Sequence, residues 1–194
     1  MQRSENKVAG ERCLDGDLRG FKVTRFADED AVQIAIQASL TGHLVFTSLH
    51  TNDSTGAITR LIDMGVEPFL ISASLELVVA QRLVRRICPK CVEPYEPTED
   101  ELMLLGLSAH EVGDKKFFKG RGCNDCNETG YKGRKVIFET LRLNDTLREM
   151  INQRAPGVVL RQKAIELGMR TLREEGLDAI FAGETSVEEI LKYT

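Results

Sequence analysis

The chain has 194 residues, of which 42% are hydrophobic and 29% charged, with a net charge of −4 and a pI near 5.5. This length suits one compact domain or two small ones, and the acidic balance argues against a general nucleic-acid binder, which would be basic over one face. Because no secretory signal opens the chain and the uncharged stretch 31–52 contains too many polar residues to span a bilayer, we expect a cytoplasmic protein with only peripheral membrane association.

The first segment, residues 1–27, is expected to be an irregular or disordered lead-in, because its first 20 residues show neither helical nor alternating periodicity. From residue 28 the pattern sharpens. Asp28 can cap a helix that ends near Gly42, and 44–49 has the composition of a short buried strand. Asp53 or Ser54 can then cap a second helix, which Gly65 ends.

A long apolar stretch leads to the first cysteines. Pro68 suits the first turn of a helix, and 69–84 is apolar enough to predict a largely buried helix that runs into Cys88. Four basic residues near its end indicate a solvated helix end or an interface with a neighbouring subunit: Arg82, Arg85, Arg86 and Lys90. A zinc-ribbon nucleic-acid interface is the weaker alternative for them, because the chain as a whole is acidic.

Two C-x-x-C pairs, separated by residues 92–122, point to a metal. Two residues between cysteines let both sulfurs of a turn face one ion about 2.3 Å away, and two such turns complete a tetrahedron. Disulfides, a redox pair and ordinary buried cysteines are the alternatives, but disulfide frameworks belong to secreted chains and a redox C-x-x-C stands singly beside a βαβ unit. The sequence therefore predicts a structural zinc site with four ligands: Cys88, Cys91, Cys123 and Cys126.

Helices and one strand are predicted around and after the cysteines. Thr98 to Glu101 matches a capping box that opens a short helix, and Ser108 can cap another. After the second pair, 136–143 is typical of a strand. The tail then predicts four helices that form a small bundle, at 145–151, 158–167, 171–182 and 186–192.

Two histidines, His43 and His50, bracket the predicted strand 44–49. In α/β proteins ligands gather at the carboxyl ends of strands, so His50 is the one that would face a site. On spacing alone, a pair of structural histidines is the favoured interpretation.

Several stretches together resemble, in order, the bacterial type II secretion and type IV pilus assembly ATPases of the GspE and PilB type: 34–53, 81–91, 122–134, 169–176 and 185–194. The resemblance covers about residues 28–194. It implies an α/β fold, the C-terminal part of a RecA-like P-loop ATPase domain with an inserted tetracysteine zinc subdomain and a helical C-terminal tail. We accordingly expect a partial RecA-like domain at 28–87, the zinc subdomain at 88–134, and a strand with a helical bundle at 135–194.

The same resemblance implies a function. Members of this family are hexameric cytoplasmic motors whose ATP turnover drives pseudopilin or pilin assembly through an inner-membrane platform protein. His43 and His50 match the family's His box, which lies by the nucleotide phosphates, and the four cysteines match its zinc ligands. The expected partners are therefore other motor subunits and the platform protein, without nucleic acid.

The ATP-binding motifs of the family are missing. A P-loop needs Gly-Lys-Ser/Thr, and the chain contains no Gly-Lys dipeptide; Thr24-Arg25 stands where the acidic motif should have Gly-Glu. Positioning and electrostatics supply nearly all of phosphoryl-transfer catalysis, so we expect no ATP hydrolysis by the chain alone, and binding of ATP and Mg²⁺ only when a P-loop-bearing segment completes the site.

Missing sheet strands would also expose edges and apolar helix faces. Truncation is the simplest interpretation of these departures. The alternative to a motor piece is a non-catalytic, zinc-stabilised docking module, or a remnant, that binds a secretion motor or platform protein.

Overall fold

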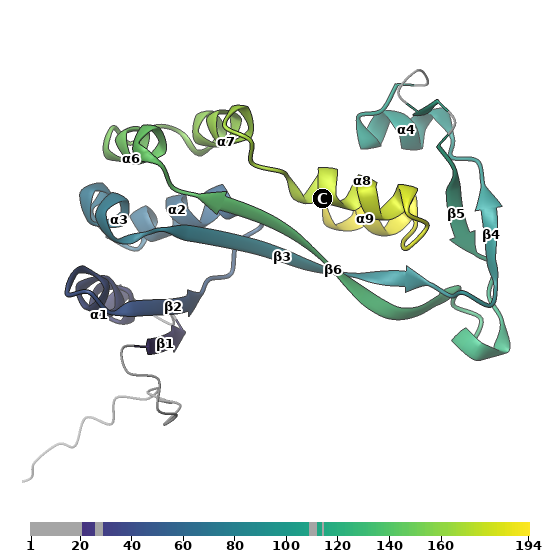
Figure 1. Cartoon of the computed structure of the whole chain (residues 1–194), viewed down its shortest axis with the longest axis horizontal. Coiled ribbons are helices and arrows are strands. Elements are labelled where there is room, and N and C mark those ends of the chain that lie inside the picture. The colour runs from purple at the N-terminus through teal and green to yellow at the C-terminus, as the bar shows by residue number, and fades with distance from the viewer. Residues whose placement is uncertain (1–20, 26–28, 109–111, 114) are drawn as a thin grey trace, which may run out of the picture. The chain divides into compact units, whose positions relative to one another are not determined.

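The computed structural model of the chain describes residues 21–25, 29–108, 112–113 and 115–194 (Figure 1). They belong to two compact units, Met1–Val78 with Arg142–Lys163, and Val79–Leu141 with Ala164–Thr194. The boundaries of these units differ from those of the predicted segments 28–87, 88–134 and 135–194. The cysteine turns share their unit with the strands beside them and with the last two helices.

The first unit begins with a small βαβ motif. β1 (Phe21–Arg25) and β2 (Leu44–Ser48) pair in parallel, from Phe21 opposite Leu44 to Arg25 opposite Ser48, and α1 (Glu29–Leu40) connects them. α1 and β2 lie where they were predicted. β1 corrects the expectation of an irregular segment up to residue 27, because its alternating pattern is too short to stand out until β2 pairs with it. The remainder of that segment lies outside the described residues.

Three further helices complete the described core of this unit: α2 (Ser54–Asp63), α3 (Pro68–Ser74) and α6 (Asp145–Asn152). α3 packs against α1 and α6. The Ser72 hydroxyl donates to Asn152 Oδ1 at 2.8 Å, and the Arg148 guanidinium donates to the Ser72 carbonyl and pairs with Glu76 at 2.9 Å. These contacts bring residues that are 76 and 80 positions apart in the sequence into one unit.

β2 is not the buried strand that its apolar composition predicted. Leu44 is 54% exposed and Phe46 is 48% exposed, as is Ile34 of α1 at 58%. Within the described residues β2 pairs with β1 alone, so it does not lie inside a wide parallel sheet whose faces are covered by helices. The predicted exposure of apolar surface is confirmed here.

The structure of residues 69–84, which span the boundary between the two units, corrects another prediction. It is not one buried helix: α3 ends at Ser74, Leu75 is extended, and β3 (Leu77–Ile87) follows. Periodicity alone does not separate a buried helix from a buried strand, and the pairing of β3 with β6 (Tyr131–Arg142) decides it. β-branched side chains were the available signal: Val78, Val79 and Val84.

A second small sheet joins β4 (Val92–Tyr95) and β5 (Phe117–Gly120), which are antiparallel. Beside it are α4 (Glu99–Leu105), α8 (Leu172–Phe181) and α9 (Val187–Tyr193). One apolar core unites these elements with β3 and β6, and its fully or nearly fully buried members include Val84, Leu105, Ile137, Ile180 and Ile190.

The tail helices lie close to their predicted positions, with α7 at Gly157–Glu166, and they are divided between the two units. α6 packs on α3 in the first unit, whereas α8 packs on α9 in the second. The capping box at Thr98 is confirmed, and the helix expected from Ser108 falls mainly on residues 109–111, outside the described ones. No helix of the described part is both long and apolar enough to cross a bilayer.

Candidate metal centre

The first cysteine turn follows directly from β3. Cys88 and Cys91 close a tight turn in which the Cys91 N–H donates to the Cys88 carbonyl at 3.3 Å. The Cys88 N–H donates to the carbonyl of Gly130, the residue before β6, at 2.9 Å. The pairing of the two long strands therefore sets where this turn begins.

The second turn is a short 3-10 helix, η1 (Asn124–Cys126), entered from Cys123. The Cys123 carbonyl accepts the N–H of Cys126 at 3.1 Å and that of Glu128 at 3.0 Å. Asn127 and Glu128 both have left-handed backbone, with φ of 51° and 60°. This reversal lets the chain turn back toward β6 within a few residues of the last cysteine.

Glycines allow the backbones around the turns to meet. A Cβ on Gly120 would lie 2.0 Å from the Gly130 carbonyl oxygen, closer than real atoms approach. Gly130 itself has φ of +78°, a conformation that other residues rarely adopt. The end of β5 and the start of β6 are thus in contact beside the cysteines.

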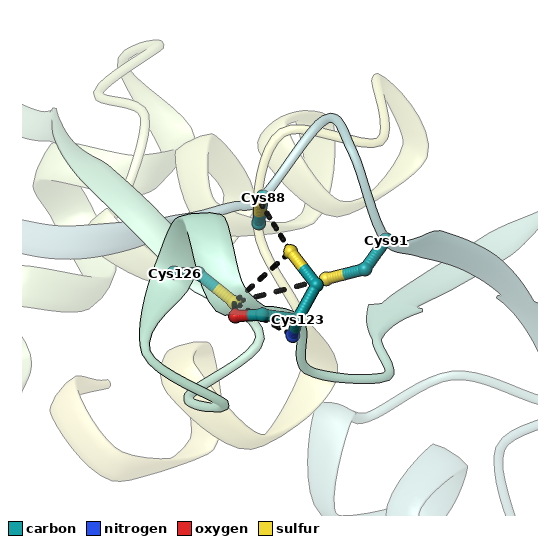
Figure 2. A group of neighbouring side chains, drawn as sticks. All are labelled: Cys88, Cys91, Cys123 and Cys126. Atoms are coloured by element: carbon teal, nitrogen blue, oxygen red, sulfur yellow. Dashed lines mark hydrogen bonds between the residues drawn. The ribbon is translucent and has the colours of Figure 1, made fainter.

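The four cysteine sulfurs form a compact group (Figure 2). Sγ of Cys88 lies 3.9 Å from Sγ of Cys123, Sγ of Cys91 lies 3.9 Å from Sγ of Cys126, and Cys123 and Cys126 are 3.7 Å apart. All four atoms are within 4.8 Å of one another. Ligands about 2.3 Å from a tetrahedral ion would be separated by about 3.8 Å, so these spacings fit a metal ion such as zinc.

No disulfide joins these cysteines, and three of them are buried while Cys123 is partly exposed. Four protein ligands would leave a tetrahedral ion no open position, which is typical of a structural rather than a catalytic site. The grouping of Cys88, Cys91, Cys123 and Cys126 is as the sequence predicted.

Hydrogen bonds to sulfur distinguish the cysteines. Burial raises the pKa of the Cys91 thiol. Burial acts in the same direction on Cys126, but the N–H groups of Cys123 and Gly130 donate to its sulfur at 3.2 Å each, and together they lower the pKa of this thiol. Cys126 is therefore better prepared than Cys91 to bind a metal as a thiolate.

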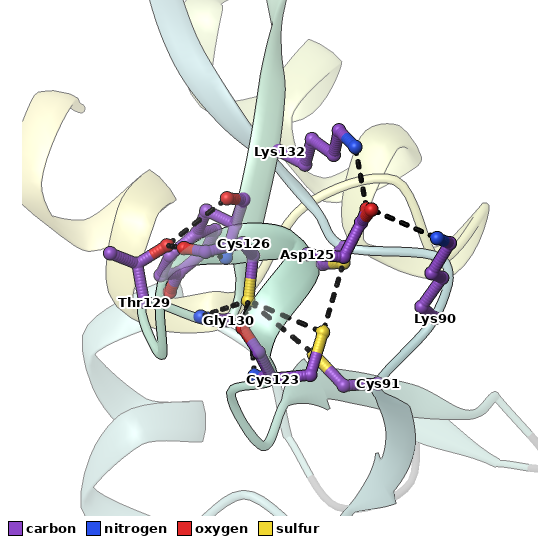
Figure 3. Close-up of polar contacts among 10 residues, drawn as sticks. Lys90, Cys91, Cys123, Asp125, Cys126, Thr129, Gly130 and Lys132 are labelled. Atoms are coloured by element: carbon purple, nitrogen blue, oxygen red, sulfur yellow. Dashed lines mark hydrogen bonds and ion pairs between the residues drawn. The ribbon is translucent and has the colours of Figure 1, made fainter.

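One carboxylate connects the two turns. Asp125 accepts from Lys90 at 2.8 Å and from Lys132 at 2.5 Å (Figure 3). The hydrogen bonds from Lys132 and Lys90 lower the pKa of Asp125 to about 2, and the bond to Asp125 raises the pKa of Lys90. Asp125 and Lys132 were not predicted from the sequence. The available signal was position, since Lys90 and Asp125 each precede the second cysteine of a C-x-x-C pair.

The other basic residues singled out from the sequence lie on β3 and not at a helix end. Arg85 pairs with the buried Glu189 at 2.5 Å, and Arg86 lies 3.7 Å from Glu184. Lys90 pairs with Asp125, and the Arg82 guanidinium donates to the carbonyl of its neighbour Gln81 at 3.0 Å. The prediction of a solvated helix end is wrong because residues 77–87 form a strand.

The two histidines lie in the first unit, whereas the cysteines lie in the second. Both are exposed. Nδ1 of His43 is 3.0 Å from the Thr41 hydroxyl and 3.2 Å from the Ala38 carbonyl, at the end of α1. His50 follows β2 and precedes the first turn of α2.

The loop after His50 is held by Asp53, which caps α2. Its Oδ1 accepts from the Gly56 N–H at 2.6 Å, and its Oδ2 pairs with Arg161 of α7 at 3.3 Å. The predicted cap at Asp53 is confirmed. Arg161 was not predicted, because only tertiary structure brings α7 to this loop.

Comparison with known proteins identifies a family and several relatives to which the chain is similar. A family model described as "Type II/IV secretion system protein" matches residues 24–192. The chain is 42% identical over 180 residues to the type IV pilus assembly ATPase PilB of Myxococcus xanthus, and 46% identical over 172 residues to the type II secretion system ATPase E of Vibrio cholerae. These alignments cover 92% and 89% of the chain but 30% and 34% of the relatives, so the chain spans about a third of their length.

Solved structures agree on the fold. The pilus retraction motor PilT with bound ADP superposes with a TM-score of 0.60 at 20% identity, covering 90% of this chain and 39% of that one. The ATPase DotB of Yersinia pseudotuberculosis gives 0.58 at 14% identity, covering 91% and 38%. The mixed α/β fold therefore matches part of such an ATPase, and the chain belongs to the type II/IV secretion system protein family.

Proposed function

We propose that this chain is the C-terminal portion of a hexameric, cytoplasmic motor ATPase that powers pseudopilin or pilin assembly. The observation that carries the proposal is the similarity, at 42–46% identity along most of the chain, to proteins named as secretion and pilus assembly ATPases. Other copies of the motor subunit and an inner-membrane platform protein are its partners.

The chain does not hydrolyse ATP alone in this proposal. It contains no Gly-Lys dipeptide, so it lacks the lysine and the hydroxyl that a P-loop directs at the phosphates and Mg²⁺. A P-loop-bearing segment completes the nucleotide site, and His50, with His43 nearby in the sequence, contributes to it. Asp53 and Arg161 hold the loop that carries His50, through the cap of α2 and an ion pair of 3.3 Å.

The metal in this proposal is zinc, held by Cys88, Cys91, Cys123 and Cys126. Bound zinc would supply cross-linking and no reaction chemistry, because four protein ligands leave it no open position. The chain's own contribution is to present four sulfurs at tetrahedral separations and to donate two backbone N–H groups to Cys126.

ATP hydrolysis tests the motor proposal. The zinc-loaded chain is assayed alone and mixed with the P-loop-bearing N-terminal half of a related motor. Turnover in the mixture and not in either part is the expected result, with a large loss in His50→Ala. Turnover by the chain alone, or none in the mixture from a folded chain, contradicts the proposal.

A docking module without chemistry is the second candidate, and the exposed apolar side chains Ile34, Leu44 and Phe46 favour it. Such a module would bind a motor or platform protein in the absence of ATP, and His50→Ala would leave its affinity unchanged. A binding assay with and without ATP, using wild type and His50→Ala, separates it from the motor piece.

A further inference from the structure

Lys90, Asp125 and Lys132 form an ionic link outside the predicted metal ligands. Lys90 stands in the middle of the first cysteine turn and Asp125 in the middle of the second (Figure 3). One oxygen of the carboxylate pairs with Lys90 at 2.8 Å and the other with Lys132 at 2.5 Å. We call these three residues the lysine–aspartate clamp.

The clamp adds side-chain links to the backbone bonds around the two turns, which run from Cys88 to Gly130 and from Arg121 to Cys91. Each turn is closed by its own bonds, Cys91 to Cys88 and Cys126 to Cys123. The ion pair between Lys90 and Asp125 joins the first turn to the second. The ion pair between Lys132 and Asp125 joins the second turn to β6, in which Lys132 lies. The two turns and the strand are thereby connected through side chains near the sulfurs.

We infer that the clamp residues are positioning residues for the metal, which keep the two cysteine turns together while a thiolate detaches and so slow the loss of the ion. This inference rests on the proposed zinc site. A metal leaves four thiolates one at a time, and a detached sulfur that stays close rebinds at high effective concentration. If the two turns separate freely, the detached sulfur moves away from the ion and rebinds more slowly.

The net charge of the clamp is a competing explanation for any effect of these residues on the rate of metal loss. Four thiolates and a divalent ion carry a net charge of −2, and two ammonium groups with one carboxylate carry +1. The clamp could therefore act by neutralising the centre and not by connecting the turns. A variant in which the connection persists but its charge is inverted distinguishes the two.

The experiment measures the rate of zinc transfer from the full purified chain to excess chromophoric chelator. Asp125→Asn removes the shared carboxylate charge and is expected to accelerate transfer about 3- to 10-fold, in line with exposed ion pairs and outer-shell partners of metal ligands. Lys119→Met removes a 3.7 Å pair with Glu93 on β4 and β5 of the same unit, and it is expected to leave the rate unchanged.

The decisive variant is the triple inversion Lys90→Asp, Asp125→Lys, Lys132→Asp, which restores both pairs with a net charge of −1. Slow transfer from this variant supports the clamp, whereas transfer faster than from wild type overturns it in favour of charge. Charge alone would make transfer slower in Asp125→Asn, where the clamp carries +2, and faster in the inversion, where it carries −1. An unchanged rate in Asp125→Asn, with one zinc bound per chain, overturns the clamp alone. A wild-type chain that binds no zinc overturns the metal assignment and the clamp with it.

Discussion

Arg85 donates to Glu189 twice, from its backbone N–H at 2.9 Å and from its guanidinium at 2.5 Å, and the Glu189 side chain is fully buried. Burial acts to raise the pKa of this carboxyl, but the two bonds from Arg85 outweigh it and lower the pKa. The same guanidinium lies 4.0 Å from the centre of the Tyr131 ring, whose hydroxyl is 2.7 Å from Ser186 Oγ. This network holds the start of α9 on β3 and β6.

Arg85→Ala should therefore destabilise the chain, because the buried carboxylate of Glu189 loses its charged partner and keeps only the backbone N–H bond. Breaking a fully buried pair costs about 3–5 kcal/mol, and since the Arg85 side chain is 43% exposed we expect about 2 kcal/mol. Urea unfolding measures this. Arg86→Ala is the control, because its 3.7 Å pair with Glu184 is half exposed and should matter little. Equal costs for the two variants would contradict the prediction.

Removing the metal should unfold the cysteine region. Cys88→Ser takes away one of four ligands, and the free energy of metal binding is folding free energy in such sites. We expect loss of zinc and of hydrogen-exchange protection over 88–134, with α2 in the other unit as the internal reference. Retained protection over 88–134 in strong chelator would show that the turns fold without metal.

Gly120→Ala should disrupt the second unit more than Gly133→Ala. At Gly120 the added Cβ would lie 2.0 Å from the Gly130 carbonyl oxygen, so backbone must move. At Gly133 nothing lies within 4 Å, and the cost is limited to the φ of +81°, about 1 kcal/mol. Zinc content and thermal unfolding of both variants check this. The prediction fails if Gly120→Ala keeps its zinc and melts with Gly133→Ala.

The pair Tyr95 and Glu101 should give the chain an alkaline dependence of stability. The bond from the Tyr95 hydroxyl to Glu101 at 2.6 Å, with burial, raises the pKa of Tyr95 to about 12, and the charge of Glu188 adds to this. The pKa is raised on folding, so the stabilisation is complete below the ordinary tyrosine value and is lost as pH rises toward 12. The Lys119 amine, 5.1 Å from the ring centre, also faces this group.

Tyrosinate absorbance reports this directly. Wild type should show a component titrating near pH 12 that is missing in Tyr95→Phe. The same bond lowers the pKa of Glu101, aided by the Thr98 N–H and hydroxyl, so its stabilisation is present above the ordinary carboxyl value and lost as pH falls through the lowered one. Tyr95→Phe should therefore weaken the acid dependence too. An unchanged tyrosinate titration curve would contradict the first expectation, and an unchanged dependence of stability on acid pH would contradict the second.

Local patterns along the chain were sufficient to predict several structural elements. Thr98 with Glu101 predicted a capping box and the start of α4, and Asp53 predicted the cap of α2, because these bonds form within one turn of helix. The paired C-x-x-C spacing likewise predicted that four sulfurs meet, since each turn brings two together on its own. The missing Gly-Lys dipeptide is also a property of the sequence by itself.

Elements that depend on distant partners had to be decided by tertiary structure. Residues 77–87 are a strand because β6, far along the chain, supplies hydrogen bonds and core contacts that outweigh the helical character of the run. β2 is exposed because, within the described residues, it pairs with β1 alone and does not lie inside a wide sheet whose faces are covered by helices. The bond of Lys90 to Asp125 and the pair of Arg161 with Asp53 join residues far apart in sequence, whose meeting no local propensity encodes.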